Sequence, residues 1–400
     1  MTENVLGRRI EDHALESVPV ESRRSWLTLS WNTAGIVTTL VQLFFGALVT
    51  FVAGLKLALM AGLLVTVVGG LLGWLIGHVA YRSGLSSTVM ARRFGFGTRG
   101  SALASLIFAF MIIGFLALEN ALLYKGLLFA FGLQDTFAHR VLIYGGLSVA
   151  WIGLTAFGFE WVSKVSSVTL VAFLVLLAWM TVTVLGKAGL SMTDALGVGT
   201  QWPVDVLRAM GADTELGKFV FAVNVLIGSA GALALVDADL GRYARSSWDI
   251  GISAFVGNLC MDVLMLALGG VIMYAGVPTL EAFYQHSQGL GLEAARQAVI
   301  ASPDSVAAAF IVFGGALGTV LMVLAQAKAQ VLNTYSASLS LANLFDALFG
   351  WRPGRFAWVV LANLVGVLML YGHLLALVNA WITLLGVLTT CFAGVIVADY

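Results

Sequence analysis

Ionisable side chains are rare in this apolar chain, so the few that lie inside hydrophobic runs are the first candidates for chemistry. A charge at membrane depth costs about 2.5–3.5 kcal/mol on insertion scales, so each one suggests a function. Glu119 lies in IIGFLALENALL, with Asn120 beside it and Phe115 four residues before it. Phe115 and Glu119 share a helix face and form an aromatic platform beside a carboxylate. This pair suits a flat ligand that donates hydrogen bonds; an ion pair between Glu119 and Lys125 is the alternative.

Two more ionisable residues interrupt later apolar runs. Lys328 stands in AQAKAQ between Gln326 and Gln330, and Asp262 stands in GNLCMDVLML. Lys328 could extend its methylene stem to the membrane surface, or it could be a fixed ammonium where a transported cation would otherwise bind. Asp262 could be its partner or a proton carrier, and the sequence leaves these alternatives open.

The stretch Asn224–Arg245 joins a glycine-rich apolar helix to four charges. Gly228-Ser229 and Gly231 predict a break in this helix around a cavity, because a freed backbone group in hydrocarbon must be satisfied by protein, ligand or ion. The alternative is that the glycines only allow close helix packing. The four charges are Asp237, Asp239, Arg242 and Arg245. They predict a salt-bridge cluster at the inner membrane surface, where it could hold an inner gate closed.

Arrangements typical of catalysis are missing from the sequence. The five histidines do not cluster, and there is no Cys/His metal spacing, Ser-His-Asp arrangement or phosphate-binding loop. GFGTRG, within Tyr81–Gly100, matches G-x-G-x-x-G formally, but a dinucleotide site needs a preceding strand that cannot form between two membrane helices. We therefore predict that the protein is not an enzyme and that it uses no cofactor or metal.

The composition predicts an all-α polytopic membrane protein. Hydrophobic residues make up 60% of the chain, charged residues 10%, and the mean hydropathy is +0.96, values that exclude an ordinary soluble domain. A span needs about 20 apolar residues, so a chain of this length holds about ten. A formal net charge of zero and the lack of a basic cluster argue against a nucleic-acid partner. The expected partners are the lipid bilayer and a small-molecule substrate.

Ten spans can be placed along the chain after a polar tail of residues 1–25, which has no apolar segment typical of a cleavable signal peptide. The predicted spans are 26–53, 56–80, 101–132, 140–160, 162–186, 218–240, 250–276, 304–330, 356–372 and 375–397. Lys and Arg are more frequent in the loops on the side of the N-terminus, which predicts that both termini are cytoplasmic in a cell (inner or plasma) membrane. The longest outside connections, 187–217 and 277–303, are expected to contain short surface helices such as Leu292–Ile300.

Two polar, glycine-marked spans suggest a duplicated design. The first span carries Asn32-Thr33-Ala34-Gly35, then Thr38, Thr39 and Gln42, and the sixth carries Gly228-Ser229. Five spans separate them, so they take corresponding positions in repeats over 26–186 and 218–400, within one transmembrane domain over 26–400. Paired interrupted helices in two halves point to a transporter site near the membrane midplane.

Four motifs, in order, give the chain a family resemblance. They are SGLSSTVMARRFGFGTRGS, GSAGALALVDADLGRYAR, NTYSASLSLANL and AGVIVADY. With them the chain resembles the nucleobase–cation symporter family one, which includes cytosine, purine, allantoin and hydantoin permeases. The resemblance implies a five-plus-five inverted-repeat fold with broken first and sixth helices. Family members usually have two further spans, so a chain that stops at Asp399-Tyr400 is expected to be a shortened or truncated member.

The resemblance also implies a substrate site and a cation site. The third-span positions that hold the base match Phe115 and Glu119, and the sixth-span positions are Gly228, Ser229 and Ala232. Thr39 and Gln42 of the first span complete the expected substrate site with Asn120. The family's sodium site matches first-span carbonyls at Gly35 and Thr38, and its eighth-span hydroxyls align with Lys328 and Ala329. An ammonium cannot coordinate sodium, which predicts sodium-independent transport, either proton-coupled or facilitative.

Together these observations predict a secondary active transporter that moves a small planar nitrogenous compound, such as a nucleobase, by alternating access. The family's base-contacting asparagine aligns with Ala325, and this departure, with Glu119, points away from cytosine. The alternatives are a transporter of a cationic amine or guanidine, a vitamin precursor or an amino acid with the same fold, and a transport-inactive membrane sensor. The sequence predicts no oligomeric state.

Overall fold

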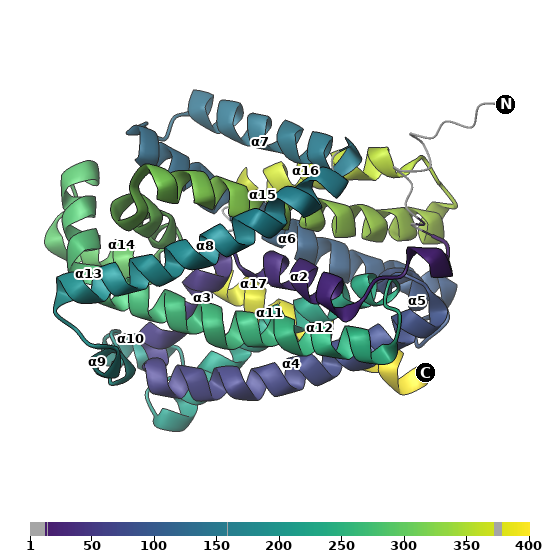
Figure 1. The fold of residues 1–400 in the computed structure, drawn as a ribbon, viewed down its shortest axis with the longest axis horizontal. Coiled ribbons are helices and arrows are strands. Elements are labelled where there is room, and N and C mark those ends of the chain that lie inside the picture. Colours follow the sequence, from purple (N-terminus) through teal and green to yellow (C-terminus); the bar gives the residue numbers. More distant parts are fainter. Residues whose placement is uncertain (1–12, 14, 158, 372–377) are drawn as a thin grey trace.

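The protein is a bundle of helices that run roughly along one common direction (Figure 1). The computed structural model describes residues 13, 15–157, 159–371 and 378–400, without the side chains of 157–169 and 371–379. No strand occurs among these residues, apart from an isolated bridge between Arg24 and Ala244. The start of α2 and the C-terminus lie at the same end of the bundle in this view. Of the polar tail predicted for residues 1–25, only residue 13 and residues 15–25 belong to the described part.

The long helices coincide with the predicted spans. They are α2 (Trp26–Val37), α3 (Leu40–Ala53), α4 (Leu55–Ser83), α6 (Gly97–Phe131), α7 (Phe137–Phe157), α8 (Phe159–Ala188), α11 (Glu215–Gly241), α12 (Ser247–Leu259), the π-helical segment η2 (Cys260–Met265), α13 (Leu266–Gln288), α15 (Ser305–Phe349), α16 (Arg355–Tyr371) and α17 (Val378–Asp399). The short helices are η1 (Val20–Ser22), α5 (Ser87–Met90), α9 (Met192–Leu196), α10 (Val204–Ala209) and α14 (Leu292–Ala301). The short surface helix predicted near Leu292 is thus confirmed as α14.

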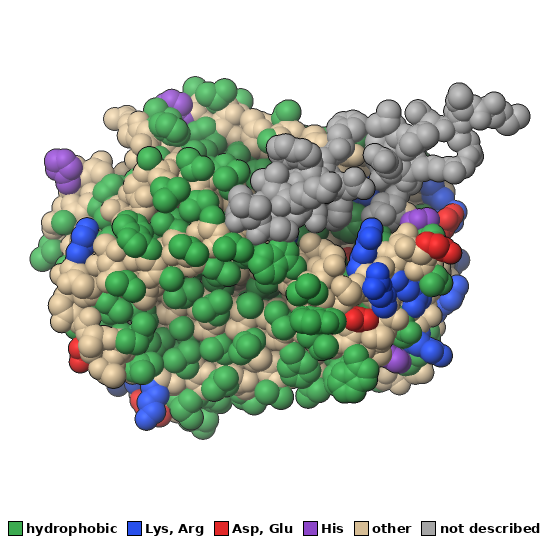
Figure 2. Space-filling model, viewed as in Figure 1, with side chains coloured by type: hydrophobic (Ala, Val, Ile, Leu, Met, Phe, Trp, Pro, Cys, Tyr) green, Lys and Arg blue, Asp and Glu red, His purple; other side chains and the backbone are tan. Residues whose placement is uncertain are grey.

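These helices make the chain a multi-pass membrane protein, as its composition predicts. Among the described residues, eight helices are long and apolar enough to cross a membrane, and the bent pair α2–α3 makes nine. α16 is a shorter apolar helix of 17 residues. Figure 2 shows hydrophobic side chains over the middle of one face, with charged side chains gathered toward its two ends. An apolar band between charged ends is the surface that a bilayer requires.

The first membrane helix is broken, as predicted. α2 and α3 meet at an angle of 64°. Thr38 (φ −88°, ψ 71°) and Thr39 (φ −126°, ψ 168°) have non-helical backbone between them. The break therefore leaves the N-terminus of α3 inside the protein, where its free N–H groups carry a partial positive charge.

The predicted break in the sixth helix is wrong: α11 is one continuous helix from Glu215 to Gly241. Its glycines serve close packing instead. A Cβ atom on Gly228 would overlap the backbone of Ile382, and one on Gly231 would overlap the Thr389 hydroxyl. Both contacts lie on α17, so the small residues let two helices approach closely.

The seventh and eighth spans are longer and less regular than predicted. α12, η2 and α13 form one 42-residue helical stretch with Pro278 inside it. The predicted connection 277–303 is therefore partly helical. α15 has 45 residues, with a non-helical Gly315 (φ 56°, ψ −142°) near its start. Because α15 continues to Phe349, the NTYSASLSLANL segment lies within this helix, beyond the predicted end of the eighth span at residue 330.

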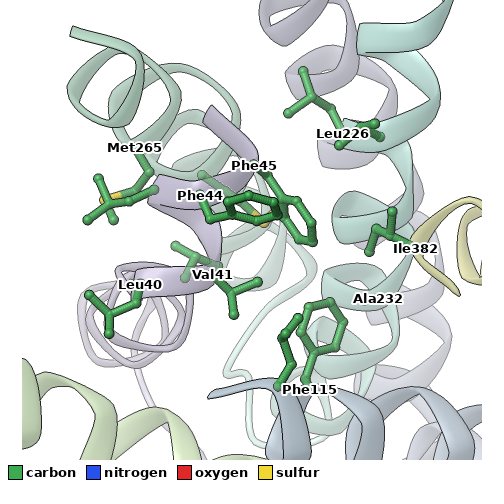
Figure 3. Packing of buried hydrophobic residues seen from close by; sticks show 14 of the residues in the cluster. Leu40, Val41, Phe44, Phe45, Phe115, Leu226, Ala232, Met265 and Ile382 are labelled. Carbon is green, nitrogen blue, oxygen red and sulfur yellow. The ribbon is translucent and has the colours of Figure 1, made fainter. Parts of the chain in front are cut away.

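Two helix pairs build most of the core. α6 packs along α15, and α4 packs along α11. α3 lies between them, and every one of its side chains is buried. Figure 3 shows Phe44 and Phe45 of α3 near Leu226 of α11 and Ile382 of α17. This packing fixes the broken first helix against α6 and α11, where the candidate site lies.

Candidate functional site

A cavity of about 40 Å³ lies beside the break in the first helix. Its walls come from α2, α3, α6, α11, η2 and α15. It is lined by Ile36, Val37, Thr39, Gln42, Ile112, Phe115, Glu119, Ser229, Ala232, Leu233, Val236, Met261, Ala329 and Asn333. Six of the eight residues predicted for substrate binding therefore meet here, from three separate spans. The volume suffices for about three water molecules, so a larger ligand requires the lining helices to move apart.

The Glu119 carboxylate lies at the N-terminus of α3. It accepts a hydrogen bond from the Gln326 side chain. The Thr39 hydroxyl and the Val41 backbone N–H group are further hydrogen-bond partners. A carboxylate at a helix N-terminus is stabilised by the free N–H groups and by the helix dipole. Glu119, which lies on α6, thus binds the start of α3 at the break of the first helix.

The predicted alternative for Glu119, an ion pair with Lys125, is wrong. The Lys125 ammonium instead lies 2.9 Å from the carboxylate of Asp135 in the connection between α6 and α7. Glu119 is only 3% exposed, and its described partners are neutral. The carboxylate also forms part of the cavity wall, so a ligand that donates hydrogen bonds can bind it in competition with these neutral donors.

Phe115 forms an aromatic wall of the cavity. Its ring packs edge-on against Trp381 of α17, with 4.9 Å between the ring centroids. Figure 3 shows Phe115 of α6 close to Ala232 of α11, with Val41 of α3 across from them. Sequence reasoning missed Trp381, because a tryptophan in an apolar span is ordinary packing until its neighbours are known.

α11 and α15 supply the remaining polar lining. The Ser229 hydroxyl is buried and makes no hydrogen bond to any described group. Asn333 lines the cavity, and its amide donates to the Gln330 side-chain oxygen over 3.3 Å. Sequence reasoning also missed Asn333. Asn333 lies four residues after Ala329, which the family resemblance aligns with the ion site. The shared helix face was the signal that could have identified Asn333.

Two predicted substrate residues lie outside the cavity. The Asn120 side-chain oxygen accepts hydrogen bonds from the Trp151 ring N–H at 2.8 Å and the Gln330 amide at 2.7 Å. Asn120 therefore ties α6 to α7 and α15. Gly228 faces α17, on the packing contact described above. In this conformation neither residue is placed to touch a ligand in the cavity.

The predicted cation-site residues lie close together. The Lys328 ammonium donates to the Trp31 carbonyl at 3.1 Å. Its side chain covers Gly35, where a Cβ atom would overlap it, and it is 3% exposed. The Thr38 hydroxyl turns back to the Ala34 carbonyl at 2.8 Å. Lys328 therefore packs inside the protein against α2 rather than extending to the membrane surface.

The four charges that end α11 do not form the predicted surface cluster. Asp237 and Arg242 are fully buried, whereas Arg245 is exposed. The Asp239 carboxylate accepts from the backbone N–H and the hydroxyl of Ser87. The Arg242 guanidinium donates to the Tyr335 hydroxyl at 2.6 Å and the His13 carbonyl at 3.0 Å. These side chains therefore meet different neighbours, although the Arg242 guanidinium also donates to the backbone carbonyl of Asp239 at 3.3 Å, where α11 ends.

In the part of the chain that the structure describes, no group of three or more His, Cys, Asp or Glu residues could hold a metal ion. Asp262 is also not the partner of Lys328. It is buried in η2, and neither carboxylate oxygen has a hydrogen-bond partner among the described groups.

Comparisons with known proteins identify the fold. No family model and no curated protein matches the sequence. Among solved structures, the chain is similar to Mhp1, a nucleobase-cation-symport-1 family transporter, in a closed conformation with bromovinylhydantoin bound. That match has a TM-score of 0.67 and 16% sequence identity over 97% of this chain and 80% of the other. The inward-facing conformation of Mhp1 gives 0.65 and 17% over 96% and 78%.

Another similar structure is MhsT in complex with L-phenylalanine, with a TM-score of 0.58 and 16% identity over 94% of this chain and 89% of that one. Each of these matches covers nearly the whole chain. The predicted inverted-repeat fold class is therefore confirmed as the fold of Mhp1, except that the sixth helix, α11, is continuous.

Proposed function

We propose that the protein is a secondary transporter that moves a small planar nitrogen-containing compound across a cell membrane by alternating access. The observation that carries this proposal is the cavity beside the helix break, with the Phe115 ring and the Glu119 carboxylate in its wall. An aromatic face stacks on a planar ring, and a carboxylate accepts N–H groups with charge-assisted hydrogen bonds. The similar structure of Mhp1 holds bromovinylhydantoin, which supports a planar ligand of this kind.

The substrate itself is expected to be rich in N–H donors or cationic. Glu119 contributes a negative charge, while Ser229 and Asn333 add a hydroxyl and an amide. An anionic substrate would face this carboxylate in a poorly hydrated space, where repulsion is strong. Protonated pyrimidines, guanidines and neutral bases with several N–H groups fit; carboxylate-bearing substrates without an amine do not.

A thermal-shift panel of the purified protein tests this proposal directly. The panel contains nucleobases, hydantoins, ureides, guanidines and free amino acids. Stabilisation grows with the logarithm of ligand concentration over Kd, so even weak ligands rank by class. The best ligand is then followed into proteoliposomes. Stabilisation by planar N–H donors together with uptake is the expected result; a panel in which none of them shifts the melting temperature contradicts the proposal.

An amine or amino-acid transporter is the second candidate. Glu119 could pair with a substrate ammonium, and the similar structure of MhsT holds L-phenylalanine. Competition between a planar base and free amino acids separates the two. Displacement of the base by amino acids at equal concentration would favour this second candidate.

Transport is also expected to be independent of sodium. The Lys328 ammonium occupies the space over Gly35 and bonds to the Trp31 carbonyl, so a positive charge already stands where the family resemblance places sodium. Uptake should stay unchanged when sodium is replaced by choline at constant pH and membrane potential. Uptake that depends steeply on the sodium concentration would contradict sodium-independent transport.

A further inference from the structure

Buried polar groups follow one face of α4, where it packs against α11 and α12. The Oδ1 atom of Asn258 lies against Gly69, and the Oδ2 atom of Asp237 lies against Gly73. Residues four apart share a helix face, with about 5–6 Å between their Cβ positions. Glycine at both positions leaves room for the two side chains between the helices.

A third polar residue extends this arrangement along α4. The backbone of Asp262 lies against Gly62, and the Thr66 hydroxyl contacts the Asn258 carbonyl at 3.5 Å. From Gly62 to Gly73, at about 1.5 Å per residue, the contacts follow α4 for about 16 Å. This distance is roughly half of a bilayer's hydrocarbon core. Asp262 also belongs to the π-helical segment η2, and such segments are frequent at functional sites.

Both carboxyl groups lack partners. Asp237, Asp262 and Asn258 are each 0% exposed. Five side-chain oxygens have no hydrogen-bond partner among the described groups. They are both carboxyl oxygens of Asp237, both carboxyl oxygens of Asp262, and Oδ1 of Asn258. Buried polar atoms in native proteins are nearly always satisfied, so an orphaned one indicates a function, a water or an ion.

No described ionisable side chain faces Asp237 from the neighbouring helices. On α4, Asp237 lies against Gly73 and Gly77. The α12 residue that contacts Gly73 is Ala254. The nearby charges are bound elsewhere: Asp239 binds Ser87, and the Arg242 guanidinium binds Tyr335.

The helices packed against η2 are α2, α3, α4, α12 and α13. α2 and α3 contain no ionisable side chain. On α4, Lys56 and Arg82 lie at the helix ends, and His78 contacts the Ser247 hydroxyl at 2.8 Å. Asp249 of α12 accepts from Ser246, Glu281 of α13 pairs with Arg296, and His286 lies in the last turn of α13. Neither Asp237 nor Asp262 forms an ion pair or hydrogen bond with a described residue.

An ionised carboxylate in this interface would be a buried, uncompensated charge, which costs several kcal/mol. A bound proton removes that charge. A hard metal cation is a poorer occupant, because it takes about six or more oxygen ligands, and the residues around Asp237 and Asn258 are glycine and alanine. The ligand that fits these carboxyl groups is a proton.

We infer that Asp237 and Asp262 are the proton-binding groups that couple proton movement to transport, an inference that rests on the proposed function. In the closed interface each carboxyl group carries its proton and is neutral. When the helices around either carboxyl group move during transport and water reaches it, the carboxyl O–H bond breaks, and the proton passes to water and leaves a carboxylate. A proton from the other side of the membrane then restores the neutral acid before the interface closes.

Infrared spectroscopy of the purified protein tests proton binding without any substrate. The variants are Asp237→Asn and Asp262→Asn, because asparagine copies the shape of a neutral aspartic acid. Asp205→Asn, on the exposed surface of α10, is the matched control. At neutral pH each test variant should lose a carbonyl-stretch component of a protonated carboxylic acid, and the control should lose none. A spectrum unchanged in both variants overturns the assignment.

Proteoliposomes test the coupling. With one proton per substrate, a gradient of one pH unit should raise accumulation about tenfold. Both test variants should keep ligand binding and melting temperature and lose this response. If wild-type uptake occurs and both variants still respond to the gradient, the assignment fails while the proposed function stands. If no ligand is transported at all, the proposed function fails, and the infrared result still decides proton binding.

Melting curves in sodium chloride and choline chloride separate protons from alkali cations. For each of the three proteins, we expect the melting curve in sodium chloride to coincide with the curve in choline chloride. Stabilisation by sodium that Asp237→Asn abolishes would show a metal-cation site and overturn the proton assignment.

Discussion

Glu119 links the candidate pocket to the backbone that forms it. Its carboxylate is bound by Gln326 and by the first residues of α3, and the same carboxylate lines the cavity. A ligand that donates to Glu119 would compete with these donors. Substrate binding and the position of α3 are therefore connected through a single side chain.

Replacing Glu119 by Gln should weaken ligand binding strongly. A hydrogen bond to a charged group contributes about 1.5–3 kcal/mol, so loss of the charge should raise Kd by roughly 10- to 150-fold. Titration of the best ligand with purified protein measures this. Glu293→Gln, on the exposed start of α14, is the control and should leave Kd unchanged. Equal affinity in Glu119→Gln and wild type would rule out the carboxylate contact.

Lys328 can be tested by separating its charge from its volume. Lys328→Met keeps a flexible chain over Gly35, whereas Lys328→Ala leaves a cavity. Truncation of a long buried side chain to alanine costs about 2–5 kcal/mol, so the alanine variant should melt at a clearly lower temperature than the methionine variant. If the two variants melt together, the side chain does not pack on α2 as described.

The continuity of α11 changes what its glycines mean. A sequence with Gly228, Ser229 and Gly231 is compatible with a broken helix and with a tightly packed one. Gly228 and Gly231 meet α17, while Ser229 and Ala232 face the cavity. The helix therefore offers one small-residue face to a neighbouring helix and another face to the cavity.

Gly228→Ala should destabilise the protein. The added methyl group would overlap the Ile382 backbone, and overpacking of this kind costs about 1–3 kcal/mol. Gly394→Ala, in α17, is the control, because a Cβ atom there meets nothing within 4 Å. Its melting temperature should equal or slightly exceed that of wild type, since alanine favours helix by up to about 1 kcal/mol. Equal destabilisation by both variants would contradict the packing.

The connection between α6 and α7 should respond to acid. Burial raises the pKa of Asp135, but hydrogen bonds from Arg140, Lys125 and Tyr124 outweigh it, so the pKa lies well below the ordinary value of 3.8. A depressed folded-state pKa stabilises the protein above the ordinary pKa, and this stabilisation is lost as pH falls below it. Asp135→Asn should melt at a lower temperature than wild type at pH 7. The difference between the two proteins should shrink as the pH falls below 3.8 toward the folded-state pKa of Asp135. A constant difference between the two proteins from pH 7 to pH 3 would contradict this.

A cluster of ion pairs joins the loop between α4 and α6 to α15. The Asp346 carboxylate of α15 pairs with Arg92, which follows α5, and with Arg352, each at 2.5 Å. The Arg92 guanidinium also donates to the Asn343 side chain at 2.6 Å. These contacts join the loop between α4 and α6 to α15, so they stabilise the packing of the two segments.

Asp346→Asn should loosen this end of the molecule. Removing one member of a largely buried ion pair leaves the other charge uncompensated and costs about 3–5 kcal/mol at most, less here because Arg352 is 66% exposed. Trypsin should cut faster at Arg92 and Arg93 in the variant. Asp205→Asn serves as control, and unchanged cleavage in Asp346→Asn would contradict the role of the pair.

The sequence was sufficient to predict the membrane class, the spans, the broken first helix and six of the fourteen residues that line the cavity. These follow from local properties: apolar run length, polar residues within a run, and residue spacing on one helix face. Glu119 and Ser229 could be selected because a polar side chain at membrane depth is unusual, and Phe115 because it lies one helical turn before Glu119.

The tertiary structure alone decided which neighbour each of these residues meets. Whether Gly228 marks a break or a packing contact depends on α17, some 150 residues away in sequence. Likewise Glu119 has Gln326 rather than Lys125 as a partner, and Asp237 lies buried against α4 rather than at the surface. Helix periodicity fixes the face on which a side chain lies, but the helix that covers that face is set by packing between distant segments, which the local sequence does not specify.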